Sequence, residues 1–244
     1  MKPLIKWSGS KRDEITHILP YIPKEYDTYL EPFIGGGALY FHLNPLRAVI
    51  SDVHSELIAF YRAIKNGGSE KIIGFMESVK NDDMTYYMVR DNMKPTNDLD
   101  FAKRFYYLRK TCFRGMLRYN SRGGFNIPFG RYKAISYSEL ENKAYEALLK
   151  RTEIFNEDFS YVFEKYNSSD NFMFLDPPYD CEFTDYGYCR FGKEEHKKLA
   201  KYFKETKIKC LMVIGRTAFI EELYAGFIKN YIRKTIGLEF TAVV

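Results

Sequence analysis

The chain has 244 residues, of which 45% are hydrophobic and 28% are charged, and its formal net charge is +5. This length and composition fit one large globular domain, or a core domain that carries an insertion, and they exclude a disordered chain. No apolar run reaches membrane-spanning length, and the first residues lack the apolar segment of a signal peptide. We therefore expect an intracellular protein with no membrane association.

The first part of the chain alternates strands and helices. A helix expected over 11–20 precedes a strand over 28–33 and a glycine turn that opens a further helix. A second strand over 47–52 ends in Asp52 and leads into a helix over 54–65. Such alternation predicts a mostly parallel sheet with helices on both faces, which is an α/β fold.

The middle of the chain breaks this alternation. Two glycines follow Asn66, polar helical segments come next, and SRGGFN, which begins at residue 121, predicts a loop or hairpin turn. The alternation then resumes, with strands expected over 152–156, 172–176, 209–214 and 239–244 and helices over 193–205 and 217–224. We therefore predict a catalytic domain made of residues 1–66 and 152–244, interrupted by an inserted domain over 67–151.

Positive charge is concentrated in one segment of this insertion. Between Phe101 and Lys133 there are nine lysines and arginines, nine aromatic residues and no aspartate or glutamate. A charged run is usually a solvated face, and aromatic residues are usually core. Cations interleaved with rings and without any acid, however, match phosphate contacts combined with base stacking or wedging. We therefore favour contact with nucleic acid.

The stretch FMFLDPPYD, over 172–180, ends an apolar run with an acid, two prolines and a tyrosine. Four consecutive apolar residues indicate a strand buried on both faces, and the prolines end it because neither can donate a ladder hydrogen bond. Asp176 is therefore expected at the carboxyl end of a central strand, where open α/β sheets bind their ligands.

A second ligand signal is EPFIGGGAL, over 31–39, where glycines join a strand to a helix. Glycines let the backbone approach a ligand, and a helix N-terminus offers unpaired N–H groups, although a structural turn would look the same. The stretch lacks the GxGxxG spacing of dinucleotide sites and the GK[ST] of P-loops. Asp52 ends the next strand and can accept hydrogen bonds from ribose hydroxyls. Together these features fit an adenosine-containing cofactor without a pyrophosphate.

The four cysteines, Cys112, Cys181, Cys189 and Cys210, form no CxxC pair and no zinc spacing. We expect reduced thiols and no metal site. Cys181 and Cys189 follow the DPPY stretch closely, but a nucleophilic cysteine needs a base and no histidine lies beside them in sequence. A catalytic cysteine is the weaker interpretation.

Six motifs, in order along nearly the whole chain, resemble those of the Dam family of DNA adenine-N6 methyltransferases, class I enzymes with the alpha-group motif order. They are KWSGSK (6–11), EPFIGGGAL (31–39), Asp52 as the ribose-binding acid, RYNSRGGFNIPFGRYK (118–133) as the target-recognition hairpin, EDF (157–159) and DPPY (176–179). The chain departs from the family at Ser10, where a glycine is usual, and at Ile214-Gly215-Arg216, where many relatives have a Ser-Asn pair.

The resemblance implies a Rossmann-like class I methyltransferase with a mostly parallel, seven-stranded sheet and an inserted helical and hairpin DNA-recognition domain. It implies S-adenosyl-L-methionine as the cofactor, bound by Trp7, Lys11, Glu31, Phe33, Gly35, Gly37, Asp52, Asp158, Phe159 and Asp176. The implied catalytic residues are Asp176, Pro177, Pro178 and Tyr179. The implied DNA-binding residues are Arg114, Leu117, Arg118, Tyr119, Asn120, Arg122, Asn126, Pro128, Arg131 and Tyr132.

The DPPY residues suit methyl transfer to adenine N6, a poor nucleophile whose lone pair is delocalised into the ring. Asp176 and the Pro177 carbonyl can each accept one N6–H, and the diproline holds that carbonyl in place. Tyr179 can stack on a base that has been rotated out of the duplex. Catalysis is then mostly positioning, and no covalent intermediate is needed.

The expected target is adenine in duplex DNA, at GATC by resemblance. Arg118 or Arg122 can pair with guanine O6 and N7. Leu117 or Pro128 can touch a thymine methyl, and Tyr119 can wedge into the stack that the flipped adenine leaves. Relatives with similar hairpins read longer or different sites, so the site stays open at this point.

Two other functions are open. A cytosine-N4 methyltransferase typically carries Ser in place of Asp176, and a glutamine- or RNA-directed enzyme more often Asn. A catalytically inactive DNA-binding relative would have no need of a cofactor cleft.

A cognate restriction endonuclease that forms no stable complex with this chain is a further expected partner, and a phage or viral genome is one setting for the gene. The oligomeric state is left open.

Overall fold

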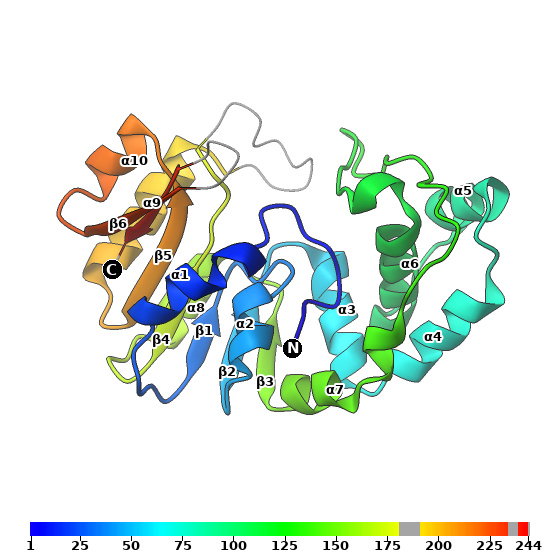
Figure 1. Ribbon diagram of the computed structural model, residues 1–244, viewed down its shortest axis with the longest axis horizontal. Coiled ribbons are helices and arrows are strands. Elements are labelled where there is room, and N and C mark those ends of the chain that lie inside the picture. Colours follow the sequence, from blue (N-terminus) through cyan, green and yellow to red (C-terminus); the bar gives the residue numbers. More distant parts are fainter. Residues whose placement is uncertain (181–190, 234–238, 244) are drawn as a thin grey trace.

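The computed structural model describes residues 1–180, 191–233 and 239–243, which form one mixed sheet flanked by helices (Figure 1). The strands are β1 (Tyr29–Glu31), β2 (Ala48–Ser51), β3 (Thr152–Phe155), β4 (Phe172–Leu175), β5 (Lys209–Gly215), β6 (Ile228–Arg233) and β7 (Glu239–Val243). Within these residues the strand order is β3-β2-β1-β4-β5-β7-β6. Strands β1 to β5 pair in parallel, and β7 runs antiparallel between β5 and β6. The predicted α/β class with a mostly parallel sheet is confirmed.

The sheet sorts its buried side chains onto two faces, because successive residues of a strand point in opposite directions. Tyr29, Ile50 and Phe174 belong to one core, and their neighbours Leu30 and Leu175 belong to the other. The first core lies under α2 (Ala38–Leu43) and α3 (Ser55–Lys65), and the second under α8 (Phe159–Lys165), α9 (Lys193–Glu205) and α10 (Ala218–Leu223). Helices on both faces leave the carboxyl ends of the parallel strands as the open edge of the sheet.

The chain between β2 and β3 adds a helical layer to one side of α3. Its elements are α4 (Ser69–Ser78), α5 (Asp83–Asn92), α6 (Asp98–Thr111), η3 (Phe113–Gly115), η4 (Ser138–Glu141) and α7 (Lys143–Lys150). Helix α6 packs along α3, where the rings of Phe60 and Tyr106 stack with centroids 5.4 Å apart. Figure 1 shows α4, α5 and α6 beyond α3, at the end of the molecule opposite β6 and α10. The buried residues of this layer join the core under α3, so one apolar core runs from the sheet into the insertion.

Residues 112–130 form the hairpin that SRGGFN predicted. Tyr119 pairs with Phe125 and Cys112 with Phe129, each by an antiparallel bridge. At the tip, the Asn120 side-chain oxygen accepts hydrogen bonds from the backbone N–H groups of Arg122, at 3.0 Å, and Gly124, at 2.9 Å. An asparagine that bonds to the backbone two residues ahead is a common way to close a tight turn.

Two elements differ from the sequence prediction. The helix expected over 11–20 is divided into η1 (Arg12–Glu14), α1 (Ile15–Ile18) and η2 (Leu19–Tyr21), with Pro20 inside the last turn. Strand β6 was not predicted, because its sequence IKNYIR has polar residues among its apolar ones and lies at the edge of the sheet, where Tyr231 is exposed. Edge strands give a weaker apolar signal than central ones.

Candidate active site

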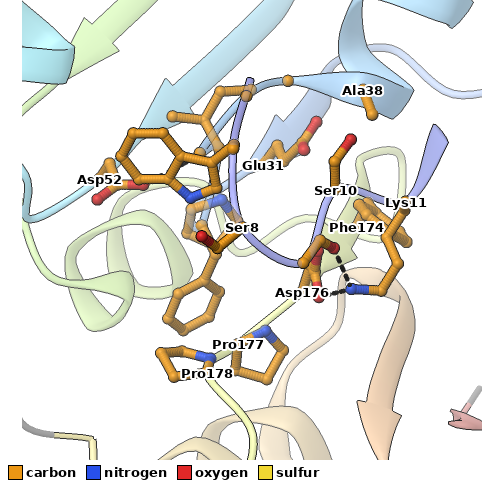
Figure 2. Close-up of a pocket in the computed structure, with 18 of the residues that line it drawn as sticks. Ser8, Ser10, Lys11, Glu31, Ala38, Asp52, Phe174, Asp176, Pro177 and Pro178 are labelled. Carbon is orange, nitrogen blue, oxygen red and sulfur yellow. Dashed lines mark hydrogen bonds and ion pairs between the residues drawn. The ribbon is translucent and has the colours of Figure 1, made fainter. Parts of the chain in front are cut away.

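A cleft opens at the carboxyl ends of β1, β2 and β4. Strands β1 and β4 are neighbours, and the helices that follow them, α2 and α9, cover opposite faces of the sheet. This is the topological switch point, where open α/β sheets bind their ligands. The cleft collects the loop 7–11, the turn after β1, Asp52 and the DPPY residues (Figure 2). Four segments that are far apart in sequence thus meet in one place.

The turn after β1 has the backbone conformation that only glycine adopts easily. Gly35 and Gly37 have positive φ angles of 43° and 66°. A Cβ atom on Gly35 would lie 2.6 Å from Nε1 of Trp7, and one on Gly36 would lie 2.9 Å from the Trp7 Cβ. The indole therefore packs directly against the turn. The Tyr61 hydroxyl also holds the turn, because it donates a hydrogen bond to the Gly35 carbonyl at 2.8 Å. A side chain at Gly35 or Gly36 would therefore collide with Trp7, and the positive φ angles at Gly35 and Gly37 favour glycine as well.

Asp52 is held at the cleft by two backbone donors. Its carboxylate accepts hydrogen bonds from the N–H of Gly35 and the N–H of His54, each at 3.0 Å. Burial raises the pKa of Asp52 to about 6, against the opposing effect of these hydrogen bonds. The group is therefore largely ionised at neutral pH and has acceptor capacity left for a ligand.

Glu31, at the end of β1, differs from Asp52 in its hydrogen-bond partner and in its pKa. Its side chain is buried and accepts a hydrogen bond of 2.6 Å from the Tyr29 hydroxyl. Burial raises the pKa of Glu31 well above its usual range, and the charge of nearby Asp176 adds to this effect. Burial penalises the charged form, so this carboxyl differs from the more readily ionised Asp52.

Lys11 is the cation of the cleft. Its side chain is buried, and its ammonium donates to a carboxylate oxygen of Asp176, to the Gly9 carbonyl at 3.0 Å and to the Tyr179 hydroxyl at 2.5 Å. Figure 2 shows the ammonium directed at Asp176 beside Pro177 and Pro178. Burial raises the pKa of Asp176, and the Lys11 charge opposes this rise.

Tyr179 packs closely on β5. A Cβ atom added to Gly215 would lie 3.3 Å from Cγ of the Tyr179 ring. Thus one of the residues at which this chain departs from the family, Gly215, is where the ring approaches the backbone. The next residue, Asp180, accepts a 3.0 Å hydrogen bond from Thr217, which also caps α10.

Asp158 and Phe159 form another wall of the cleft. Asp158 accepts hydrogen bonds from the Ser160 N–H and from Lys198, each at 3.0 Å. Burial acts to raise the pKa of Asp158, but the bonds from Ser160 and Lys198 outweigh it and leave the pKa below its usual value. The Phe159 ring stacks on Phe33 at 5.5 Å, which gives the cleft an apolar surface.

The DNA-binding candidates divide between the outside and the inside of the hairpin. Those exposed to solvent are Arg114, Arg118, Asn120, Arg122, Pro128 and Arg131. Asn126 and Tyr132 are half-buried. The side chain of Asn126 accepts a hydrogen bond from Arg118 at 2.8 Å, and the backbone carbonyl of Tyr132 accepts one from the side chain of Asn81. Leu117 instead lines the cleft, and Tyr119 points its hydroxyl at Glu56 and His54.

Further residues that line the cleft were given no role in the sequence analysis. They are Ser8, Gly9, Ser10, Pro32, Ile34, Gly36, Ala38, Leu39, Val53, Phe174, Phe191 and Glu195. All but Val53, Phe191 and Glu195 lie within the quoted stretches KWSGSK, EPFIGGGAL and FMFLDPPYD. Phe191 and Glu195 lie beyond the DPPY stretch in no motif, and only the fold brings them to the cleft.

The structure also bears on the cysteines, metals and membranes. Cys112 is buried and Cys210 half-buried, and both are free thiols, whereas Cys181 and Cys189 lie outside the described residues. The part of the chain that is described contains no group of three or more histidine, cysteine or acidic side chains that could hold a metal ion. Nor does it contain a helix long and apolar enough to cross a membrane.

The sheet order, with its antiparallel β7 between β5 and β6, and the cleft at the switch point define a class I methyltransferase fold. A family model for D12 class N6 adenine-specific DNA methyltransferases matches residues 7–235. The chain belongs to this family. It is an adenine-specific DNA methyltransferase, and its substrate is DNA.

Individual proteins to which the chain is similar are also named as type II methyltransferases or DNA adenine methylases. The chain is 57% identical over 236 residues to the type II methyltransferase M.CviBI of Paramecium bursaria Chlorella virus NC1A, covering 96% of this chain and 90% of the relative. It is 33% identical to the type II methyltransferase M.MjaIII of Methanocaldococcus jannaschii, covering 96% and 92%. It is 30% identical to the DNA adenine methylase of Haemophilus influenzae, covering 92% and 83%.

Proposed function

We propose that this enzyme transfers a methyl group from S-adenosyl-L-methionine to N6 of an adenine that has been rotated out of duplex DNA, within GATC. The observation that carries the proposal is the meeting of Asp52 and Asp176 in one cleft, with the glycine turn between them. The first acid suits a ribose and the second an exocyclic amine. A cleft with both can hold an adenosine cofactor and a target base together.

The cleft fits the cofactor. Asp52 keeps acceptor capacity for ribose hydroxyls, because the N–H groups of Gly35 and His54 each use only one acceptor position of its carboxylate. The stacked rings of Phe33 and Phe159 and the indole of Trp7 offer apolar surface for an adenine. We assign cofactor binding to Trp7, Lys11, Glu31, Phe33, Gly35, Gly37, Asp52, Asp158, Phe159 and Asp176. When bound, the sulfonium supplies a methyl group whose carbon–sulfur bond breaks as the bond to N6 forms.

The DPPY residues act on the amine. Asp176, which the Lys11 ammonium contacts, accepts one N6–H. The Pro177 carbonyl accepts the other, so the nitrogen lone pair is turned out of conjugation with the ring. Pro178 stiffens this turn, and Tyr179, braced on Gly215, packs on the base. The proton that N6 loses leaves through Asp176 to solvent.

The insertion binds the DNA in this proposal. The exposed arginines of the hairpin 112–130 contact phosphates or guanine edges, and the sheet portion, residues 1–66 and 152–244, carries out the chemistry. Rotation of the adenine out of the helix is required because a stacked base cannot reach Asp176 inside the cleft. The Tyr119 hydroxyl is bonded inward, to Glu56 and His54, so the wedging of Tyr119 into the stack is not part of this proposal.

The GATC assignment rests on the resemblance of the hairpin sequence 118–133. Arg118 and Arg122 are exposed, which supports the proposal that they contact guanine edges. Two relatives are named type II methyltransferases, which favours a cognate restriction endonuclease as a functional partner of this enzyme as well. We propose no stable complex with it.

Incubation of the enzyme with methyl-labelled S-adenosylmethionine and duplex DNA, followed by nucleoside analysis, tests the proposal. We expect the label in N6-methyladenosine and, by sequencing, in GATC. Label in N4-methylcytosine, or no label in any base, would reject the proposed chemistry. Label in adenine within a longer or different site would reject only the GATC assignment.

A further inference from the structure

One strand of the hairpin forms part of the wall of the active-site cleft. Leu117 lines the cleft, Arg118 points to solvent, and Tyr119 points inward again. This alternation is that of a strand with one buried face. The segment 116–119 therefore has its outer face toward the proposed DNA side and its inner face against the proposed cofactor site.

His54 connects this segment to the cofactor site. Its backbone N–H donates to Asp52 at 3.0 Å, and its ring lies edge-on to Trp7 with centroids 5.6 Å apart. Its Nδ1 accepts the N–H of Leu57 at 3.1 Å, and its Nε2 lies 2.9 Å from the Tyr119 hydroxyl. One buried side chain thus touches two cofactor-site residues and the recognition hairpin.

The hydrogen-bond directions in this group are determined. Because Nδ1 accepts from a backbone N–H, the neutral ring carries its proton on Nε2, which donates to the Tyr119 oxygen. The Tyr119 hydroxyl then donates to Glu56 at 2.7 Å. The other oxygen of Glu56 accepts from Arg104 of α6 at 2.6 Å. Burial lowers the pKa of His54 to about 3, so the ring stays neutral over the working range of pH.

A second buried connection runs beside the first. The Arg109 guanidinium is buried and donates to the carbonyl of Lys6, just before the loop 7–11, and to the carbonyl of Met116 at 2.6 Å. Both ends of the segment 116–119 are therefore tied to the sheet portion. Movement of this segment must disturb the walls of the cleft.

We infer that His54 is a positioning residue that holds the recognition segment 116–119 in place through the Tyr119 hydroxyl, and so makes cofactor binding and DNA binding favour each other. The inference rests on the proposed function. A cofactor that packs on Trp7 and Leu117 stabilises the arrangement described here, and DNA bound by the outer face of the hairpin stabilises the same arrangement. Two ligands that favour one arrangement bind with positive coupling.

Tyr119→Phe is the first variant, because it keeps the ring and removes only the hydroxyl that contacts His54 and Glu56. His54→Asn is the second variant: its oxygen can still cap the Leu57 N–H, but it is too short to reach Tyr119. Tyr107→Phe is the matched control, because it removes a buried hydroxyl that bonds only within the insertion, to the Lys80 carbonyl at 3.1 Å. Each protein is titrated with the non-reactive cofactor analogue sinefungin, alone and with saturating duplex DNA that contains GATC.

The measured quantity is the ratio of the two sinefungin dissociation constants. We expect the wild type and Tyr107→Phe to bind sinefungin about fivefold or more tightly with DNA than without it. In Tyr119→Phe and His54→Asn the ratio should fall close to one, while sinefungin binding without DNA is weakened much less. A purely structural role would weaken both constants equally and leave the ratio unchanged.

An unchanged ratio in both variants, or a wild-type ratio of one with both ligands bound, overturns the inference and leaves the proposed function intact. Failure of the wild type to bind sinefungin overturns the proposed function and the inference together.

Discussion

The ammonium group of Lys11 lies against the carboxylate of Asp176, although 165 residues separate the two in sequence. The lysine side chain is almost fully buried and the aspartate only partly so. A buried carboxylate is costly to ionise without a partner; burial raises the pKa of Asp176, and the charge of Lys11 opposes that rise. In the proposed complex the adenine amine donates to this same carboxylate, so Lys11 and the substrate share one acceptor group.

Loss of the Asp176 carboxylate should separate chemistry from DNA binding. Asp176→Ala removes the acceptor proposed for N6, so we expect methyl transfer below about one-thousandth of the wild-type rate, with DNA affinity largely kept. Radiolabel incorporation measures methyl transfer, and a gel-shift assay measures DNA binding.

Arg131→Ala should have the opposite effect: DNA binding becomes weaker, and its salt dependence falls by about one phosphate contact. An equal loss of DNA binding in both variants would contradict this division.

Removal of the Lys11 charge should move the acidic limb of the pH–rate profile. The Lys11 charge lowers the pKa of Asp176 against the effect of burial. In Lys11→Met the pKa of Asp176 therefore rises, the ionised fraction falls at a given pH, and the acidic limb of kcat/KM, which reports the free enzyme, shifts to higher pH. Lys143→Met, which removes a surface partner of Glu70, is the control and should leave the limb in place. A limb at the same pH in Lys11→Met would show that Asp176 does not titrate in it.

Cofactor affinity should fall as the pH drops through 6. Burial raises the pKa of Asp52 to about 6, so the carboxylate is ionised above that pH and protonated below it. Ribose hydroxyls are bound best by the ionised form, so sinefungin affinity should be constant above about pH 7 and fall by up to about tenfold per pH unit below 6. Asp52→Asn should bind more weakly but without this dependence. A flat wild-type profile between pH 5 and 8, with the fold intact by circular dichroism, would contradict the assignment.

A side chain at Gly215 should slow the chemistry and spare DNA binding. A Cβ there already comes within 3.3 Å of the Tyr179 ring, so Gly215→Val must displace it. We expect kcat to fall about tenfold or more, because a small displacement of the ring that positions the base lowers the rate of the chemical step strongly. Gly74→Val is the control, since a Cβ at Gly74 meets nothing within 4 Å. An unchanged kcat in Gly215→Val would mean that Tyr179 does not hold the base.

DNA modified by the enzyme should resist a nuclease that adenine methylation in GATC blocks. Plasmid DNA is treated with enzyme and S-adenosylmethionine and then digested, and an Asp176→Ala preparation serves as the control. If the treated DNA is cut completely while labelled methyl groups are present in adenine, the GATC assignment is wrong and the enzyme class stands.

The sequence predicted the sheet well, because its central strands are runs of buried apolar residues. The expected strand over 172–176 and helix over 193–205 match β4 and α9 almost residue for residue. The helix expected over 11–20 was wrong as a continuous element: 3-10 turns flank α1, and Lys11 precedes the first of them and contacts Asp176. Periodicity describes one segment at a time and does not contain such a long-range contact.

The site was predicted unevenly for the same reason. Motif spacing indicated Asp52 and Asp176 because each acid ends a buried strand, and parallel strands end at one edge. The inward direction of Tyr119 could not be predicted, because it depends on Glu56 and His54 of another element. A tyrosine within a basic stretch has the same local pattern whether it faces solvent or the core.

The hairpin that we propose reads the target also has a face that lines the cleft, and this limits how target specificity can be exchanged between relatives. Transplanting the whole segment 112–130 from another enzyme would bring an inner face shaped for a different cleft. Exchange of the outward residues alone, with Leu117 and Tyr119 kept, preserves the contacts with the cleft wall and with His54. New specificities of this scaffold should therefore arise by substitution on alternate residues rather than by replacement of the hairpin as a module.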